Sequence, residues 1–332
     1  MIETVSLAPD LSICRIVNGM WQVAGGHGHI TPSKAVSEMQ LYHNSGLTIW
    51  DMADIYGPAE EFYGKFHQNM AKSGCNVDGM VGMTKFVPNP GPMNKPTVER
   101  AIRNSILRMN VPALDLVQFH WWDYDDPRYF DALEQLTVLC DEGKIRHIGL
   151  TNFDTVRMQM MLDKGIKIVS NQVQYSIIDQ RPQVEMEKFC KKNNIKLLAY
   201  GALAGGLLSE KFIDLSEPTR IELDTYSLQK YHNMVDAWGG WGLFQKLLYT
   251  LNKIAKKHHA SIANIATRFV LDKPQVAGVI VGARLGITQH IEQNKQTFSL
   301  KLDSDDYSAI SEIITQANDL YGIIGDCGSE YR

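Results

Sequence analysis

The chain of 332 residues is 44% hydrophobic and 21% charged, with a formal net charge of −4 at pH 7. This composition is typical of a soluble globular protein and predicts one domain over residues 1–332, without the positive charge that favours nucleic acid or anionic membranes as partners. No run of about 18 apolar residues could span a bilayer, and five scattered cysteines with no N-terminal signal segment predict a reduced, cytoplasmic protein.

Short apolar runs alternate with segments of helical length along the chain. The eight apolar runs, which we expect to be strands, are residues 15–21, 47–51, 80–85, 114–120, 145–150, 166–172, 195–200 and 276–281. The segments expected to be helices are residues 34–44, 60–72, 98–109, 129–141, 155–162, 184–193, 244–258 and 262–271. The apolar runs are nearly continuous, as in "LDLVQF" and "IKLLAY", which is typical of parallel strands buried on both faces.

Residues that begin or end helices flank several of these segments. Ser33 and Thr97 are expected to cap the N-termini of two helices through their side-chain oxygens. Gly46, Gly143 and Gly165 follow helices, at positions where a left-handed backbone conformation is common. These signals support the helix assignments independently of the apolar pattern.

Eight strand–helix units fit an α/β fold of the (β/α)8 type, a closed parallel barrel ringed by helices. An open doubly wound sheet uses the same units and is the alternative that periodicity leaves open. A dinucleotide-binding open sheet should carry Gly-x-Gly-x-x-Gly after its first strand, and that motif is absent here, which favours the barrel. We also expect a long loop at residues 208–241, with a short helix at 228–237, and a C-terminal tail at 321–332.

Three consecutive strands of the expected barrel end in residues that can do chemistry. The second ends in Asp51, the third in Lys85 and the fourth in His120, each separated by about one strand–helix unit, and Tyr56 follows Asp51 on the next loop. Strand ends of a barrel meet at one rim, where active sites lie. Each residue alone also has a purely structural interpretation. Asp51 could be a cap or turn residue, Lys85 a solvated charge, His120 a core histidine and Tyr56 a turn residue. Their shared placement favours a single site.

These residue types suit proton transfer to a carbonyl oxygen. A tyrosine has an ordinary pKa of about 10, and a neighbouring ammonium group lowers it by favouring the phenolate. The carboxylate would fix the lysine and keep it charged, and a neutral histidine could bind the carbonyl oxygen. No nucleophile or metal-binding cluster is evident, so we expect no metal and a hydride-carrying cofactor at the carbon atom.

The candidate residues resemble the catalytic set of the aldo-keto reductases. "DMADIY" at residues 51–56 is similar to the family's Asp-x-Ala-x-x-Tyr motif, and "TK" and "QFH" supply the lysine and the histidine. The resemblance extends from about residue 15 to residue 298. It implies a (β/α)8 barrel that binds NADPH, or less often NADH, without a Rossmann fold, and that reduces aldehydes and ketones or catalyses the reverse oxidation.

The resemblance also implies which residues hold the cofactor. The segments concerned are "NGMW" for the nicotinamide ribose, "LTNF" and "SNQVQY" for the carboxamide, "AYGALAGGLL" for nicotinamide stacking and the pyrophosphate, and "VGARLGITQHIEQN" for the 2′-phosphate and the adenine. Stacking needs a flat ring, and close backbone approach needs missing side chains. The implied residues are Gly19, Met20, Trp21, Asp51, Thr151, Asn152, Gln172, Tyr200, Gly201, Leu203, Gly205, Gly206, Gly282, Arg284, Gln289 and Asn294.

Substrate contacts are expected from Trp21, Tyr56, His120 and Trp121, with Trp122 either at the same aromatic mouth or packed in the core. The segment 284–294 is about two residues longer than the family pattern. Two other functions remain open: a regulatory NADPH-binding protein similar to potassium-channel β subunits, and a sugar or polyol dehydrogenase. The expected partner is a small carbonyl compound, and the sequence gives no indication of oligomeric state.

Overall fold

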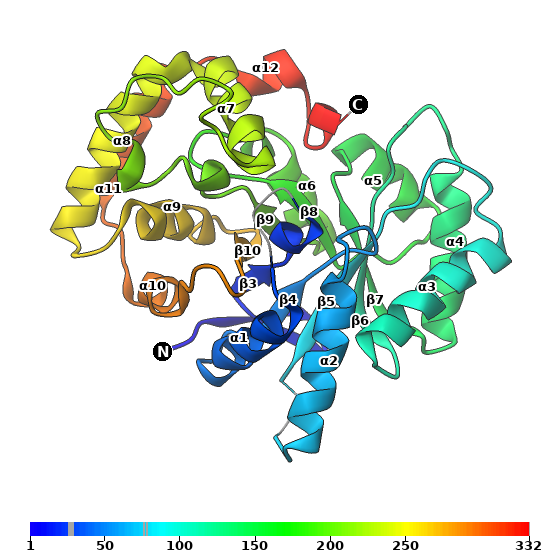
Figure 1. Cartoon of the computed structure of the whole chain (residues 1–332). Helices are drawn as coiled ribbons and strands as arrows, with labels where there is room; N and C mark the ends of the chain where they lie inside the picture. The colour runs from blue at the N-terminus through cyan, green and yellow to red at the C-terminus, as the bar shows by residue number, and fades with distance from the viewer. Residues whose placement is uncertain (26–29, 76, 78, 332) are drawn as a thin grey trace.

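The computed structural model describes residues 1–25, 30–75, 77 and 79–331, and its centre is a closed parallel barrel (Figure 1). The barrel strands are β3 (Ile16–Gly19), β4 (Ile49–Asp51), β5 (Val81–Phe86), β6 (Leu114–Phe119), β7 (Ile145–Thr151), β8 (Ser170–Gln174), β9 (Lys196–Tyr200) and β10 (Val276–Gly282). Neighbours in sequence pair in space, and β10 pairs with β3 to close the ring. The predicted (β/α)8 barrel is confirmed, because an open sheet would leave two strand edges unpaired.

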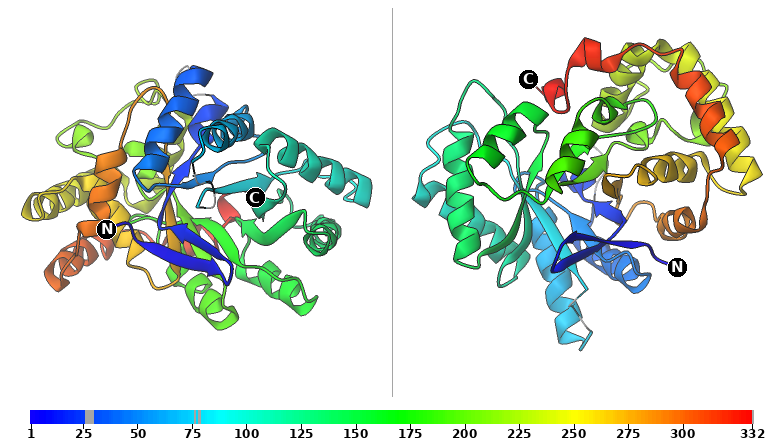
Figure 2. Two further views of the ribbon diagram at one scale, coloured as in Figure 1. Left: turned by 90° about the horizontal axis from the view of Figure 1, so that it is seen from below. Right: turned by 180° about the vertical axis from the view of Figure 1, so that it is seen from behind.

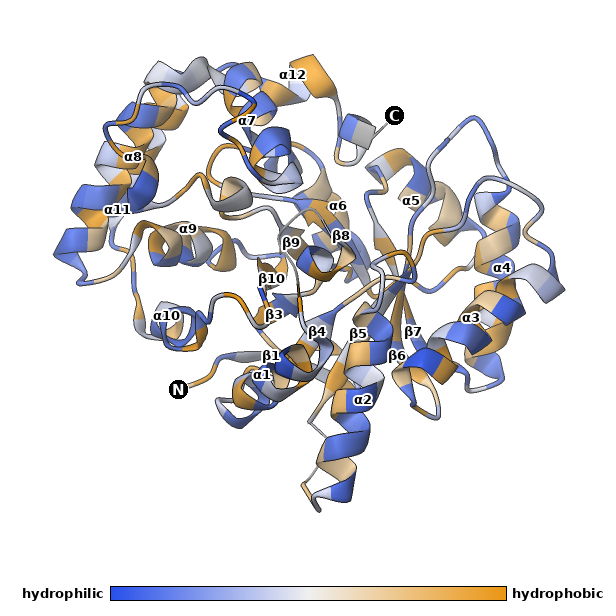
Figure 3. Ribbon diagram, in the orientation of Figure 1, coloured by the Kyte–Doolittle hydropathy of each residue, from blue (hydrophilic) through white to orange (hydrophobic). Residues whose placement is uncertain are grey.

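Helices surround the barrel and cover its outer face. They are α1 (Pro32–Asn44), α2 (Ala59–Lys72), α3 (Lys95–Met109), α4 (Tyr129–Asp141), α5 (Thr155–Asp163), α6 (Met186–Asn193), α7 (Tyr226–Trp238), α8 (Gly240–Lys257), α9 (Ile262–Leu271), α10 (Ile291–Gln296), α11 (Ser304–Ile314) and α12 (Leu320–Ile324). Figure 3 shows polar residues on the outer faces of many of these helices. Within the described part of the chain, none of the helices has both the length and the apolar character needed to cross a membrane.

An antiparallel hairpin at the N-terminus was not expected from the sequence. It consists of β1 (Thr4–Ala8) and β2 (Leu11–Cys14), and β2 leads directly into the first barrel strand. Seen from below in Figure 2, the hairpin lies across the barrel. Leu11 and Ile13 are buried, so the hairpin closes the end at which the strands begin and leaves the opposite end for the site.

The segment after β9 contains more helix than the sequence predicts. Two short 3-10 turns, η3 (Ala204–Gly206) and η4 (Glu210–Phe212), precede α7, which is longer at both ends than the expected helix at 228–237. Helix α8 also begins four residues earlier than expected, at Gly240. The loop assigned to residues 208–241 is therefore largely a helical layer, and α7 packs on η3 at the rim of the barrel.

Two predicted helix caps are wrong because the helices begin earlier. Helix α1 begins at Pro32, whose ring suits a first helical position, so Ser33 lies inside the helix. Helix α3 begins at Lys95, and the side chain of Asn94 accepts a hydrogen bond from the Thr97 amide. The glycine predictions are confirmed, since Gly46, Gly143 and Gly165 have φ of 91°, 73° and 78°.

Helices α2 and α3 approach each other most closely at Gly64. A Cβ atom at this position would lie 2.1 Å from the Arg108 carbonyl oxygen, which is backbone and cannot move aside cheaply. Gly64→Ala should therefore lower the free energy of unfolding by about 1–3 kcal/mol, although alanine is intrinsically a better helix former than glycine by about 1 kcal/mol. Urea denaturation followed by circular dichroism measures the change.

Gly242 in α8 provides the matched control. It is an exposed helical glycine with no heavy atom within 4 Å of an added Cβ. Gly242→Ala should raise stability by roughly 0.4–1 kcal/mol. If both substitutions stabilise the protein equally, the two helices do not pack as closely at Gly64 as the structure places them.

Candidate active site

The four candidate catalytic residues meet at the C-terminal rim of the barrel. Asp51 ends β4, Lys85 lies near the end of β5, His120 directly follows β6, and Tyr56 lies on the loop after β4. The Lys85 ammonium donates a hydrogen bond to the Asp51 carboxylate and another, of 3.1 Å, to the Met52 carbonyl oxygen. Strand order alone brings these residues together, because β4, β5 and β6 are neighbours in the barrel.

The Asp51 carboxylate is buried, and several donors satisfy it. Its second oxygen accepts hydrogen bonds of 2.8 Å from the side-chain amides of both Gln118 and Gln172. Gln172 also donates to the Gln118 side-chain oxygen at 2.7 Å. A buried carboxylate is tolerated only with such partners. Gln118 is thus a member of the site that the sequence did not single out, and Gln172, implied as a carboxamide ligand, is engaged with Asp51 here.

Tyr56 lies directly above the buried ion pair. The Lys85 nitrogen is 5.0 Å from the centre of the Tyr56 ring, and the Trp21 ring contacts Tyr56 edge-on at 5.0 Å between centroids. Burial lowers the pKa of Lys85 below its ordinary value, and the charge of Asp51 opposes that change. A positive charge near a tyrosine favours the phenolate, so this placement is compatible with the predicted activation of Tyr56.

His120 is oriented by a backbone acceptor. Its Nδ1 atom lies 3.1 Å from the Thr151 carbonyl oxygen, so Nδ1 carries the hydrogen in this bond. In the neutral ring Nε2 is then an acceptor, and only the doubly protonated ring donates from both nitrogens. A carbonyl oxygen needs a donor, so with this tautomer its binding would require the doubly protonated ring. The role of His120 at a substrate oxygen stays a prediction.

The residues implied for the nicotinamide end form a connected group. The Tyr200 hydroxyl donates to the Asn152 side-chain oxygen at 2.9 Å. Asn152 has φ of 59°, a left-handed conformation that is uncommon outside glycine and often marks functional positions. Among the described residues, the buried Thr151 hydroxyl oxygen has no hydrogen-bond partner. A carboxamide bound here would satisfy it, so these residues fit the nicotinamide group.

The glycines implied for the pyrophosphate do not all leave open space. A Cβ at Gly201 would lie 2.3 Å from the Tyr231 hydroxyl, and one at Gly205 would lie 2.7 Å from the Ser227 carbonyl oxygen. These two glycines therefore make room for α7. Gly206 has no heavy atom within 4 Å of an added Cβ, so it is the position in this segment at which a ligand can approach the backbone.

The adenosine end of the implied site lies on a tight turn. The amides of Ile287 and Thr288 donate to the Arg284 carbonyl oxygen at 2.9 and 3.1 Å, and the Arg284 side chain is half-buried. After the turn, α10 carries Asn294. Gln289 is exposed and lines a surface hollow of about 520 Å³ between this turn and α1.

The remaining implied cofactor positions lie on the rim or close to it. Met20 is buried and Trp21 begins a short 3-10 turn, η1 (Trp21–Ala24), directly after β3. A Cβ at Gly282 would lie 2.3 Å from the Gln22 side-chain nitrogen, and one at Gly19 would lie 2.7 Å from Ile280. The absence of side chains at these two glycines thus serves packing within the rim.

Of the three tryptophans considered for the aromatic mouth, Trp21 and Trp122 are exposed and Trp121 is buried. Trp121 is 0% exposed, and its indole nitrogen donates to the Asp126 carbonyl oxygen at 3.0 Å. Trp122 is 39% exposed and contacts the His120 ring edge-on at 4.5 Å between centroids. The expected substrate contact of Trp121 is therefore wrong, because its side chain is buried, while Trp122 stays a candidate.

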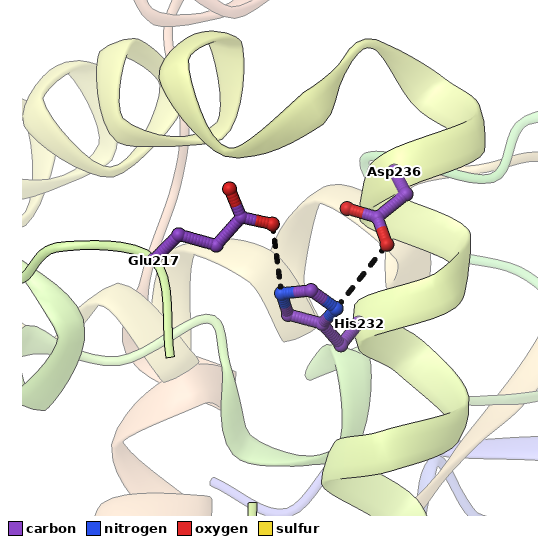
Figure 4. A group of neighbouring side chains, drawn as sticks. All are labelled: Glu217, His232 and Asp236. Carbon is purple, nitrogen blue, oxygen red and sulfur yellow. Dashed lines mark ion pairs between the residues drawn. The ribbon is translucent and has the colours of Figure 1, made fainter. Parts of the chain in front are cut away.

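Two groups of side chains elsewhere have the composition of a metal site. Figure 4 shows His232 of α7 between Glu217 and Asp236, with one carboxylate at each ring nitrogen, at 3.4 and 3.3 Å. One ligand atom from each of these three residues lies within 4.8 Å of the other two. When protonated, the ring links the loop after β9 to α7. The second group is His258, Asp303 and Asp306, and the Lys257 ammonium already bonds both of its carboxylates.

Comparisons with known proteins agree with this geometry. A sequence model described as the Aldo/keto reductase family matches residues 15–315, and the chain therefore belongs to that family. Members of the family are NAD(P)H-dependent oxidoreductases that act on carbonyl or alcohol groups. The predicted family is thus confirmed.

Individual relatives are distant. The chain is 34% identical to flagellar radial spoke protein 5 of Chlamydomonas reinhardtii over 62% of its length and 44% of that protein's length, so it spans less than half of this relative. It is 24% identical to the chloroplastic pyridoxal reductase of Arabidopsis thaliana, over 92% of the chain and 84% of the relative. The solved glycerol dehydrogenase of Gluconobacter oxydans matches with a TM-score of 0.78 at 22% identity, covering 96% and 97% of the two chains.

Replacing the buried lysine tests its role beside the tyrosine. Lys85→Met removes the positive charge 5.0 Å from the Tyr56 ring, so the phenolate loses its stabilising neighbour. We expect the ionisation seen in the pH–rate profile of carbonyl reduction to move to higher pH in the variant. Steady-state rates between pH 6 and about 10, where free tyrosine ionises, measure the change.

The exposed Lys65 of α2 supplies the control, since Lys65→Met alters the same charge on the surface and should leave the profile unchanged. Cofactor binding by Lys85→Met, measured separately, reports whether the barrel is intact. An intact variant whose profile coincides with that of the wild type would assign Lys85 a purely structural role.

Proposed function

We propose that the protein is an NADPH-dependent reductase of aldehydes or ketones. The observation that carries the proposal is the buried Asp51–Lys85 ion pair directly beneath the Tyr56 ring. The exposed rings of Trp21 and Trp122 favour a substrate with an aromatic or apolar group. The relative named pyridoxal reductase, whose substrate is an aromatic aldehyde, supports the same class. All five cysteines are free thiols, which suits a cytoplasmic location.

The protein's own residues would handle the proton, while the bound nicotinamide supplies or accepts hydride at the substrate carbon. Tyr56 donates the proton to the carbonyl oxygen during reduction and accepts it in the reverse direction. Lys85 stabilises the phenolate that remains after donation, and Asp51 fixes the position of Lys85. Thr151, Asn152 and Tyr200 would hold the nicotinamide ring in place.

His120 determines which substrate form the site binds best. With Nδ1 donating to the Thr151 carbonyl oxygen, the neutral ring offers an acceptor at Nε2. That acceptor suits the hydroxyl of an alcohol, while the protonated ring suits a carbonyl oxygen. This observation favours alcohol oxidation as the second candidate function, with reduction promoted at lower pH.

The deciding experiment follows NADPH and NADH oxidation with a panel of aldehydes, ketones and quinones, together with NADP⁺ reduction by sugars and polyols. Turnover with a carbonyl panel member supports the reductase, and turnover only with alcohols supports the dehydrogenase. Tight cofactor binding without turnover of any compound would instead favour a regulatory cofactor-binding protein.

Tyr56→Phe tests the proton donor, because it removes the hydroxyl and keeps the ring that contacts Trp21 and Lys85. We expect the reduction rate to fall by about 10²–10⁴-fold, the usual range for loss of general acid–base catalysis. The dissociation constant for NADPH should stay near that of the wild type. Tyr63→Phe, in the core of α2, removes a hydroxyl away from the rim and should keep the rate. Near-normal turnover by Tyr56→Phe would exclude this residue as the donor.

Arg284 is proposed to recognise the 2′-phosphate that distinguishes NADPH from NADH. Hydrogen bonds between charged groups contribute roughly 1.5–3 kcal/mol each, so NADPH should bind about ten- to a hundredfold more tightly than NADH. Arg284→Ala should weaken NADPH binding and leave NADH binding nearly unchanged, as measured by fluorescence titration. The exposed Arg100 of α3 is the control for loss of a surface charge. Equal losses for both cofactors would mean that Arg284 maintains the turn or contacts a part that the two cofactors share.

A further inference from the structure

The C-terminal tail returns to the rim of the barrel at the nicotinamide end of the site. Figure 1 shows the chain continuing from α12 to its end beside α5 and α6. The Asp326 carboxylate accepts hydrogen bonds from the amide and the hydroxyl of Thr155, at 2.8 and 2.9 Å, and so caps the first turn of α5. Cys327 is buried next to it. The tail is therefore fixed on the barrel by specific contacts.

One residue of this tail reaches the group that binds nicotinamide. The Glu330 carboxylate accepts a hydrogen bond of 2.9 Å from Arg181, and another of 2.9 Å from the Gly328 amide. Its other oxygen lies 3.3 Å from the Tyr200 hydroxyl, close enough to be an alternative acceptor for the hydroxyl hydrogen. Both Glu330 and Arg181 have buried side chains. The carboxylate thus connects a buried cation to the tyrosine expected to stack on nicotinamide.

Arg181 holds this carboxylate firmly because its own position is fixed. Two other guanidinium nitrogens of Arg181 bond both oxygens of Asp179, at 2.9 and 2.8 Å. This bidentate geometry leaves the third nitrogen directed at Glu330. A carboxylate with so little solvent access is costly without such a partner. The position of Glu330 is therefore set by the core, although the residue lies only two positions from the chain end.

The Tyr200 hydroxyl has one hydrogen and two acceptors, Asn152 at 2.9 Å and Glu330 at 3.3 Å. A hydrogen bond to a charged acceptor is stronger than one to a neutral acceptor. The Glu330 carboxylate is therefore the stronger acceptor for this hydrogen, although its oxygen lies farther from the hydroxyl than that of Asn152. The Lys230 ammonium, 5.2 Å from the centre of the Tyr200 ring, is a further charge facing this residue, from α7.

We propose that Glu330 is a positioning residue of the nicotinamide site, which holds the Tyr200 ring in place through its hydroxyl. The inference rests on the proposed function in that it takes the bound group to be a nicotinamide cofactor. Because the nicotinamide half is common to both cofactors, loss of Glu330 weakens the binding of NADPH and of NADH equally. This pattern is the opposite of the selective loss expected for Arg284→Ala.

The test measures dissociation constants for NADPH and NADH by quenching of tryptophan fluorescence, with melting temperature as a separate readout. Glu330→Ala should raise the dissociation constants of both cofactors by about 3- to 10-fold, the effect of losing one hydrogen bond. Glu330→Gln, which keeps the volume and an acceptor oxygen, should recover part of the affinity. Glu312→Ala, an exposed glutamate on α11, should change neither constant.

A double substitution separates positioning of Tyr200 from simple anchoring of the tail. In a Tyr200→Phe background the hydroxyl is absent, so Glu330→Ala should cause no further loss of cofactor affinity. An undiminished loss in that background overturns the proposal, as does a Glu330→Ala variant with a lowered melting temperature and unchanged constants for both cofactors.

The two proposals fail in different ways. A wild-type protein that binds NADPH but turns over no substrate overturns the proposed reductase, while the binding comparison still decides the role of Glu330. A wild-type protein that binds neither cofactor overturns both.

Discussion

A lysine and an aspartate buried together at the rim of the barrel are the constraint on which the remaining site depends. Neither charge is stable alone in the core, since desolvation is costly and only a partner and further hydrogen bonds offset it. The protein supplies these bonds through the Met52 carbonyl and the side chains of Gln118 and Gln172. Four strands, β4, β5, β6 and β8, therefore contribute to one network. Any change in their register would leave a buried charge without a partner.

The group proposed to transfer the proton lies outside this network. Tyr56 is on a loop, half-buried, with its ring over the Lys85 ammonium. His120 directly follows β6, and its hydrogen bond to the Thr151 carbonyl oxygen determines which ring nitrogen carries the hydrogen. A buried ion pair thus lies beside the proposed proton donor, so a substitution in the pair is expected to change the ionisation of Tyr56.

The wall expected to face nicotinamide is assembled from distant parts of the chain. Asn152 follows β7, Tyr200 ends β9, and Glu330 comes from the tail. Helix α7 covers the neighbouring glycine segment and is linked to the preceding loop through His232. These contacts join the long insertion and the tail to the barrel, so both additions to the fold converge on the region that would hold the cofactor.

The sequence by itself determined the barrel, the order of its strands and the rim position of the catalytic candidates. Continuous apolar runs are diagnostic of strands covered on both sides, and parallel strands carry their end residues to one edge whatever the details of packing. The N-terminal hairpin escaped this reasoning because its strands are only five and four residues long and neither is a continuous apolar run. Only the tertiary structure decided which His120 nitrogen carries the hydrogen, which of Trp121 and Trp122 is exposed, and that Glu330 contacts Tyr200. Each of these depends on which atoms from remote segments lie within about 3 Å of one another, the range of a hydrogen bond, and the spacing of residues along a chain does not contain that information.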